Sequence, residues 1–259
     1  MAECGETDNG FILKSGAGEK IVDLAIITPI YNQFVFTAQY IKDLSNLDAR
    51  HKIILIDNGS TDNSFEKAIE LIKATPHECQ FMVLHNKENY GFGRGSNRGT
   101  KFVDIETKAI LFLNNDIRVS KDYLKTWTNS LLEYVDKYEN ALFSPMGGLI
   151  DSNFNFVYET RKSGDKFNYL SGWCLFGAIK TFDKIIALNG DVFDDDFFCY
   201  FEDTYLSLQA RAAGIHLMMA DLPIQHLGRM TGKTMDMGKM YLESREIFIG
   251  KCKEKGYKP

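Results

Sequence analysis

Long hydrophobic segments are missing from this sequence, and their absence excludes a large class of proteins. No apolar run approaches the ~20 residues that a membrane-spanning helix needs. The first twenty residues are polar and glycine-rich, and they contain no apolar core of the kind found in signal peptides. We therefore expect a flexible N-terminal arm over residues 1–20 and a cytoplasmic protein, for which peripheral contact with a membrane stays open.

Cysteine is also scarce and irregularly placed. The number of cysteines is odd, and no two are spaced as C-x-x-C: Cys4, Cys79, Cys174, Cys199 and Cys252. This pattern indicates reduced thiols in a cytosolic compartment, and it argues against both a disulfide framework and a zinc site.

A surplus of positive charge is lacking as well. The net charge is −5 at pH 7, which disfavours a nucleic-acid-binding surface. Repeats and low-complexity linkers are absent, and the 259 residues are 44% apolar and 25% charged, as in an ordinary globular protein. We expect one domain over 21–259 with three parts: a nucleotide-binding half (21–119), an acceptor-binding and catalytic half (120–230) and a C-terminal helix (231–259).

The first half contains short apolar runs that alternate with helical patterns. The runs cover 24–28, 53–56, 81–84 and 109–113, and helical spacing of apolar residues covers 33–47 and 65–74. This alternation predicts an α/β fold, with a Rossmann-like, mostly parallel sheet, right-handed crossovers and flanking helices. Pro29 is expected to end the first strand, because proline lacks the N–H that a strand ladder needs.

The second half is less regular. We expect a helix over 121–137 capped by Ser120, a β-hairpin arm over 154–158, helices over 182–188, 202–213 and 234–255, and a last strand over 215–220.

Polar clusters come just after the apolar runs of the first half, at 28–32, 57–60, 89–97 and 114–116. Because the carboxyl ends of parallel strands meet at one edge of a sheet, these clusters should gather in a cleft. Asp116 at that edge is well placed to hold a divalent cation against a phosphate. The bland alternative is an ordinary polar turn after each strand.

The glycine-rich stretch at 91–95, G-F-G-R-G, does not fit a dinucleotide-binding motif. Its spacing is G-x-G-x-G rather than G-x-G-x-x-G, and it follows the third predicted strand rather than the first. A dehydrogenase is therefore disfavoured.

Two further features could carry chemistry. Glu202 and Asp203 follow an aromatic stretch over 197–201, which would desolvate a carboxylate and raise its pKa, as suits a general base. An acidic pair at a helix start could instead only compensate the helix dipole. His226 follows the last predicted strand and is a candidate metal ligand together with Asp116, although a lone histidine is more often a structural hydrogen-bond partner.

Six motifs, taken in order, resemble those of the family-2 inverting glycosyltransferases. They are I-I-T-P-I-Y-N at 26–32, I-D-N-G-S-T-D at 56–62, N-Y-G-F-G-R-G-S-N-R-G at 89–99, F-L-N-N-D at 112–116, S-G-W-C at 171–174, and F-C-Y-F-E-D-T-Y-L-S-L-Q-A-R-A-A-G at 198–214. The resemblance is closest to the rhamnosyltransferase-like branch and runs over about 24–228. It implies a GT-A fold and a hexosyltransferase-type enzyme that uses a nucleotide-diphosphate sugar.

The resemblance also implies a role for each matching residue. Thr28, Tyr31 and Asp57 would hold the base and ribose of the donor, and Asn89, Gly91 and Asn97 would lie by its ribose and diphosphate. Asp116 would bind Mn²⁺ or Mg²⁺ on the diphosphate with His226 as second ligand, Asp203 would be the base ahead of Glu202, and Trp173 would line the sugar and acceptor pocket. Asn115 joins the donor-binding set, and Arg94 or Arg229 would stabilise the leaving diphosphate.

The sequence departs from the family pattern at two places. The metal motif D-x-D has Asn114 at its first position, so one anionic ligand is lost and metal affinity should be lower. The Q-x-x-R-W motif of processive synthases is absent, because Arg211 is followed by two alanines. This favours the addition of a single sugar.

We expect an inverting enzyme that moves one sugar from a UDP-sugar or dTDP-rhamnose to a hydroxyl of a glycan or lipid-linked saccharide, in polysaccharide biosynthesis. The alternative is a nucleotide-sugar-binding module with impaired catalysis, which Asn114 favours and the intact Glu202–Asp203 pair opposes. A nucleotidyltransferase is disfavoured, since no G-x-G-x-R stretch lies beside the first strand.

Overall fold

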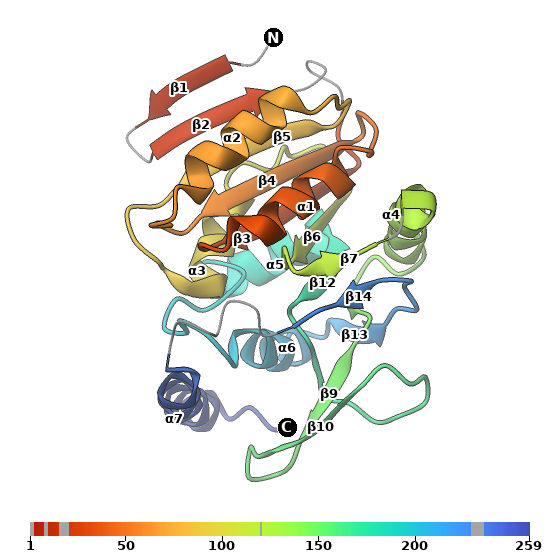
Figure 1. Ribbon diagram of the computed structural model, residues 1–259. Helices are drawn as coiled ribbons and strands as arrows, with labels where there is room; N and C mark the ends of the chain where they lie inside the picture. The colour runs from red at the N-terminus through yellow and green to blue at the C-terminus, as the bar shows by residue number, and fades with distance from the viewer. Residues whose placement is uncertain (1–2, 8–9, 16–20, 120, 229–235) are drawn as a thin grey trace.

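A nine-stranded sheet runs through the centre of the molecule, in the order β1-β2-β5-β4-β3-β6-β12-β8-β13 (Figure 1). The computed structural model describes residues 3–7, 10–15, 21–119, 121–228 and 236–259. The elements below are given in the order in which they build this sheet.

Four parallel strands form the core of the sheet: β3 (Leu24–Ile30), β4 (His51–Asp57), β5 (Gln80–His85) and β6 (Ala109–Leu113). The first three of these strands are each followed by a helix: α1 (Phe34–Leu44), α2 (Ser64–Ala74) and α3 (Gly91–Thr100). Every residue of β4 and β6 is buried, because apolar clusters cover both faces of the sheet. Burial on both faces is why these strands are continuous apolar runs in the sequence, and the predicted α/β class is confirmed.

Pro29 corrects the sequence analysis, because β3 continues through it to Ile30. Pairing with β6 ends at Ile27, whereas pairing with β4 continues to Ile30. The Ile30 carbonyl accepts from the N–H of Asn58 on the β4 side, so Pro29, one residue earlier, directs its nitrogen to the other side. The ladder has already ended on that side, and the missing N–H costs no strand pairing.

The second half of the sheet is antiparallel at its centre. Strand β12 (Cys174–Ala178) lies between β6 and β8 (Ala141–Ser144) and runs antiparallel to both, and β13 (His216–Met219) adds to β8 in parallel. Helix α4 (Lys121–Lys137) has the predicted bounds, while α5 (Ile179–Asn189) and α6 (Glu202–Ala212) lie close to the predicted ranges. The sequence analysis predicts no strand at β12, a five-residue segment that directly follows the S-G-W of the S-G-W-C motif.

Two small sheets lie beside the main one. Strand β9 (Gly147–Ile150) pairs with β10 (Phe156–Thr160) and with β11 (Tyr169–Leu170), so the hairpin arm predicted at 154–158 is present and begins slightly later. Strand β7 (Ile117–Arg118) pairs with β14 (Gln225–His226), and this two-residue ladder brings His226 to the end of β6.

The N-terminal arm corrects a second expectation. Strands β1 (Glu3–Thr7) and β2 (Gly10–Ser15) form a hairpin, and β2 pairs antiparallel with β5. The available sign was the short apolar run Phe11-Ile12-Leu13 within this otherwise polar and glycine-rich segment.

The last helix, α7 (Met237–Lys255), packs near α6 at the end of the molecule away from β1 (Figure 1). A separate apolar cluster joins it to the segment before α6, and its members are Ile150, Tyr169, Phe197, Phe201, Tyr205, Leu208, Phe248 and Cys252. The predicted cap Ser120, the predicted helix start Thr234 and the candidate Arg229 lie outside the described residues.

Two expectations from what the sequence lacks can be compared with the structure. In the described part of the chain, Cys79, Cys174, Cys199 and Cys252 are free thiols. None of the described helices combines the length and the apolar character needed to cross a membrane.

Candidate functional site

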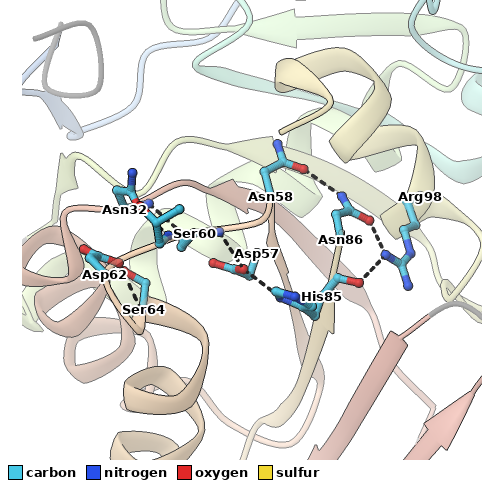
Figure 2. Close-up of polar contacts among 10 residues, drawn as sticks. Asn32, Asp57, Asn58, Ser60, Asp62, Ser64, His85, Asn86 and Arg98 are labelled. Atoms are coloured by element: carbon cyan, nitrogen blue, oxygen red, sulfur yellow. Dashed lines mark hydrogen bonds and ion pairs between the residues drawn. The ribbon is translucent and has the colours of Figure 1, made fainter. Parts of the chain in front are cut away.

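The loops after β3 and β4 are tied together at the carboxyl edge of the sheet (Figure 2). The Asn32 N–H donates to Ser60 Oγ at 2.8 Å, and the Thr61 N–H donates to Asn32 Oδ1 at 2.8 Å. Asp62 accepts from the backbone N–H groups of Phe34 at 3.4 Å and Ser64 at 3.0 Å, so it satisfies the first turns of both α1 and α2. These polar residues hold the rim of the site in place.

Asp57 ends β4 with its side chain fully buried. Its Oδ2 accepts from the Ser60 N–H at 3.1 Å and lies 2.9 Å from His85 Nδ1 (Figure 2). Its Oδ1 has no hydrogen-bond partner among the described residues. A buried carboxylate oxygen without a donor is costly, so this atom is an acceptor that a donor group from a ligand would satisfy.

An amide ladder supports the start of α3 and was missed by the sequence analysis. Asn58 Nδ2 donates to the Gly91 carbonyl at 2.9 Å, and Asn58 Oδ1 accepts from Asn86 Nδ2 at 2.7 Å. Arg98 donates to Asn86 Oδ1 and to the His85 carbonyl (Figure 2). The available signal was position, because His85 and Asn86 directly follow the third apolar run, as the other polar clusters follow theirs.

Gly91 joins this ladder to the catalytic half of the chain. Its φ is +79°, and a Cβ there would lie 1.9 Å from the Phe198 carbonyl oxygen, so only glycine fits. Asn89 Oδ1 accepts from the Gly91 N–H at 2.9 Å, and the Phe92 N–H donates to the Phe198 carbonyl at 3.2 Å. Asn89 and Gly91 therefore shape the turn that faces the 198–203 segment.

Two predicted donor-binding side chains, those of Thr28 and Asn97, make their hydrogen bonds within the protein. The Thr28 hydroxyl is fully buried and lies 2.6 Å from the Tyr40 hydroxyl, where it joins β3 to α1. Asn97 is buried and exchanges two hydrogen bonds with the backbone of Phe193, at 2.7 and 2.9 Å. Its proximity to the site in sequence does not expose its amide, because this amide holds the 193–195 loop against α3.

The other predicted donor-site residues lie at the surface or the rim. Tyr31 is half-buried in the loop after β3, and Asn115 donates to Thr37 Oγ1 of α1 at 2.9 Å. The Arg94 guanidinium lies over the Tyr90 ring, 4.9 Å from its centroid, and 3.9 Å from Asp195. Arg94 is half exposed and remains able to reach a phosphate.

Asp116 and His226 come together as a pair at the end of β6. His226 Nε2 lies 3.0 Å from Asp116 Oδ1 and 3.3 Å from Asn114 Nδ2, and the Leu227 N–H donates to the Asp116 carbonyl at 2.9 Å. The Trp173 ring stacks on the imidazole, with centroids 4.7 Å apart and planes 8° apart. Stacking and strand pairing together fix the imidazole toward the carboxylate.

The Asp116–His226 pair fits a divalent cation. Neighbouring ligands of an octahedral ion bound at ~2.1 Å are about 3 Å apart, close to the observed separation. Carboxylate oxygen and neutral imidazole nitrogen suit Mn²⁺, and an exchange of the Asn114 amide atoms would add a carbonyl oxygen. Within the described ranges no group of three His, Cys, Asp or Glu residues gathers.

Asp203 lies at the start of α6 in a network of three donors. Its Oδ2 accepts from the Gly172 N–H at 2.7 Å, and its Oδ1 accepts from the Thr204 N–H at 2.6 Å and the Thr204 hydroxyl at 3.1 Å. Burial raises the pKa of Asp203 above its ordinary value and the charge of Glu159 adds to this, against these hydrogen bonds, which lower it. A carboxylate held in position with a raised pKa is suited to accept a proton.

Glu202 differs from its neighbour in its contacts. Burial and the adjacent Asp203 charge raise its pKa, and its Oε2 has no hydrogen-bond partner in the described part of the chain. Like charges side by side cannot both ionise freely, so Glu202 is the more readily protonated member of the pair.

A short chain of contacts connects the Asp116–His226 pair to Asp203. The Asn114 N–H donates to the Trp173 carbonyl at 2.9 Å, Trp173 stacks on His226, and the adjacent Gly172 donates to Asp203. The site therefore contains an unpartnered buried acceptor atom at Asp57, the Asp116–His226 pair near the end of β6 and a buried carboxylate pair at the start of α6.

The arrangement of a parallel α/β core with polar loops at its carboxyl edge defines a nucleotide-binding transferase fold of the GT-A type. The sequence profile of the family described as Glycosyl transferase family 2 matches residues 25–200. This match covers more than half of the chain, and the chain belongs to that family.

Solved structures show the same fold at low identity. S. aureus TarS 1–349 in complex with UDP aligns with a TM-score of 0.53 and 14% identity, over 77% of this chain and 58% of that one. S. aureus TarS aligns with a TM-score of 0.51 and 14% identity, over 77% of this chain and 35% of that one. The catalytic domain of Drosophila beta-1,4-galactosyltransferase 7 in complex with xylobiose gives 0.47 and 15%, over 86% and 78%. No curated protein matches the chain in sequence.

Proposed function

We propose that this protein is an inverting glycosyltransferase that moves one sugar from a nucleotide-diphosphate sugar to a hydroxyl group of a saccharide acceptor. The observation that carries the proposal is the connection of Asp203 to the Asp116–His226 pair through Gly172 and Trp173. In-line displacement at an anomeric carbon requires a base for the attacking hydroxyl and a group that binds the leaving diphosphate, held close to each other.

In the proposed reaction Asp203 takes the proton from the acceptor hydroxyl. The hydroxyl oxygen forms a bond to the anomeric carbon, the bond from that carbon to the diphosphate oxygen breaks, and the configuration inverts. Asp116 and His226, with Asn114 beside them, would hold Mn²⁺ or Mg²⁺, which when bound neutralises charge on the leaving diphosphate. Arg94, on α3, supplies a second positive charge for that group.

Asp57 would take a hydrogen bond from the base or ribose of the donor. The support is its unpartnered Oδ1 and its place at the carboxyl end of a central strand. UDP-sugars and dTDP-rhamnose are both candidate donors, and a glycan or a lipid-linked saccharide is the candidate acceptor. A buried oxygen without a hydrogen-bond partner is expected at a binding site, where the bound ligand supplies the N–H or O–H group.

A second candidate function is a nucleotide-sugar-binding module with impaired catalysis. It is favoured by Asn114, an amide where a second carboxylate would strengthen cation binding, 3.3 Å from His226. Donor turnover separates the two candidates, because only an enzyme releases nucleoside diphosphate from the donor by slow hydrolysis.

The test is a thermal-shift panel of UDP-, GDP- and dTDP-sugars with and without Mn²⁺, followed by calorimetry. A ligand at a hundred times its dissociation constant adds ~2.7 kcal/mol of stability, which a melting curve detects readily. Stabilisation by one nucleotide class, lost in Asp57→Ala but retained in the exposed control Asp136→Ala on α4, supports the proposal. No stabilisation by any nucleotide sugar would overturn it.

A further inference from the structure

A pocket of about 680 Å³ lies between α1 and the β7–β14 ladder, and Asp57 is not among its lining residues. In this ladder Arg118 pairs with Gln225, and Ile117 pairs with His226. Successive residues of a strand face opposite sides, so Arg118 and Gln225 face the hollow while His226 faces the Asp116 side. The β7–β14 ladder therefore lies between this pocket and the Asp116–His226 pair, and it contributes residues to both.

Two guanidinium groups, those of Arg118 and Arg161, line the pocket. Among the described residues neither Arg118 nor Arg161 forms an ion pair. Arg118 donates to the Ile117 carbonyl at 2.6 Å, and Arg161 donates to the carbonyls of Leu222 and Ile224 at 3.0 and 2.9 Å. Carbonyl acceptors do not neutralise charge, and each guanidinium has five N–H donors, so several remain free.

Asp43 is the acidic residue of the pocket lining, and its Oδ1 accepts from Gln39 Nε2 at 2.8 Å. Two arginines and one aspartate give the lining a formal charge of +1 in a chain whose net charge is −5. A concave surface with free guanidinium N–H groups attracts anions, and guanidinium binds phosphate or carboxylate through two parallel hydrogen bonds.

The pocket lies on the acceptor side of the proposed reaction. The Arg161 guanidinium is 5.9 Å from the centroid of the Trp173 ring, and Trp173 follows Gly172, which holds Asp203. Gln225 directly precedes His226. Asp57, the proposed nucleotide contact, ends β4, on the far side of β3 from β6 and its β7 extension.

We propose that this pocket binds an anionic group, a phosphate or a carboxylate, carried by the saccharide acceptor, with Arg118 and Arg161 as its ligands. The proposal rests on the proposed function, which makes a saccharide the acceptor. The volume is that of a small-ligand site and accommodates a charged sugar unit rather than a bare ion.

The test is calorimetric titration of the full chain with glucose 6-phosphate, glucuronate, glucose and inorganic phosphate, in separate runs with and without saturating UDP. We expect at least one charged sugar to bind whether or not UDP is present, and glucose not to bind. Arg118→Gln should weaken that binding about tenfold or more, because it removes a charged fork. Arg161→Gln should do the same. Arg161→Gln could fail to fold, because Arg161 donates to the carbonyls of Leu222 and Ile224. In that case Arg118→Gln alone decides the test.

Arg245→Gln is the matched control, since Arg245 is a half-buried arginine of α7 that lies outside the pocket lining and donates to Asn155 Oδ1 at 2.7 Å. Equal weakening in Arg245→Gln, no weakening in Arg118→Gln, or displacement by UDP would overturn the proposal. Inorganic phosphate that binds as tightly as either sugar would also overturn it, by showing a site for free phosphate. Charged-sugar binding that depends on Arg118, in a protein that binds no nucleotide sugar, would retain the anion site and reject the glycosyltransferase function instead.

Discussion

Replacement of Asp203 by asparagine is the most informative single change, because it removes the proposed base while keeping its shape. The carboxylate accepts from the Gly172 N–H, the Thr204 N–H and the Thr204 hydroxyl. Asparagine has one acceptor oxygen, so its NH₂ must face either Gly172 or Thr204 and leave that N–H without a partner. An unsatisfied buried donor costs about 1–3 kcal/mol, and the loss of a desolvated charge offsets part of this.

The variant should therefore fold, with a stability loss of a few kcal/mol or less. General base catalysis contributes ~10²–10⁴-fold, so turnover should fall by that factor. This is about 3–5 kcal/mol of transition-state stabilisation. Donor affinity should remain nearly unchanged, because the proposed base contacts the acceptor and not the diphosphate.

The assay is the release of nucleoside diphosphate at saturating donor, with donor affinity measured by calorimetry on the same preparations. Glu202→Gln is the matched control and should be the milder change in turnover. Reasoning from the Asp203 contacts would be refuted by the reverse ranking, with Asp203→Asn active and Glu202→Gln inactive. Loss of donor binding in Asp203→Asn would equally remove Asp203 from the role of base.

The other predictions concern the nucleotide, the cation and the pH profile. Asp57→Ala should weaken nucleoside-diphosphate binding by about tenfold or more, through loss of a buried acceptor, and unchanged calorimetric affinity would exclude it from the site. Asp116→Ala should abolish metal-stimulated donor binding and His226→Ala should weaken it; turnover that survives EDTA would exclude a cation. Glu159→Gln removes a charge that raises the Asp203 pKa, so the acid limb of the turnover profile should move to lower pH, and an unmoved limb would contradict this.

The pH dependence of stability follows from the Glu202–Asp203 pair. Both carboxyls have raised pKa values in the folded protein. Above pH ~4 these two groups therefore bind more protons in the folded protein than in the unfolded chain. Their contribution to stability is full below the unfolded pKa values and is lost as pH rises through the folded ones. Glu202→Gln should reduce this loss, so denaturant midpoints of the variant and the wild type should differ most at alkaline pH. Parallel pH curves would contradict the raised pKa of Glu202.

The parallel core and the polar edge could be predicted from the sequence because both depend on local patterns. Strands buried on both faces leave continuous apolar runs, and the residues that follow them must lie at one edge. The proximity of Asp116 and His226, 110 positions apart, was also anticipated, because each follows a predicted strand. The pattern of apolar runs was enough to predict this proximity, because residues that follow the strands of one sheet are confined to its edge.

Side-chain direction could not be predicted in the same way. Thr28 and Asn97 lie in motifs that match the family, yet one hydroxyl faces Tyr40 and one amide faces the Phe193 backbone. A single residue of register decides which side of a strand or helix a side chain occupies, and this depends on packing partners far along the chain. The antiparallel β12, inserted between β6 and β8, was missed for a related reason, because its strand character comes from its neighbours.

The position of the proposed base depends on a helix that lies outside the family match. Tyr200 and Phe201, just before Glu202, have φ of 69° and 65°, a left-handed conformation that costs aromatic residues of order 1 kcal/mol each. Helix α7 contacts this turn directly: Phe248 stacks on Phe201 at 5.0 Å, and the Ser244 hydroxyl donates to the Cys199 carbonyl at 2.6 Å. The family profile ends at residue 200, so α6 and α7 lie outside the part of the sequence that the profile covers. Motif order therefore identifies the family and the place of the Glu202–Asp203 pair in the sequence, whereas the backbone conformation just before this pair depends on contacts with α7.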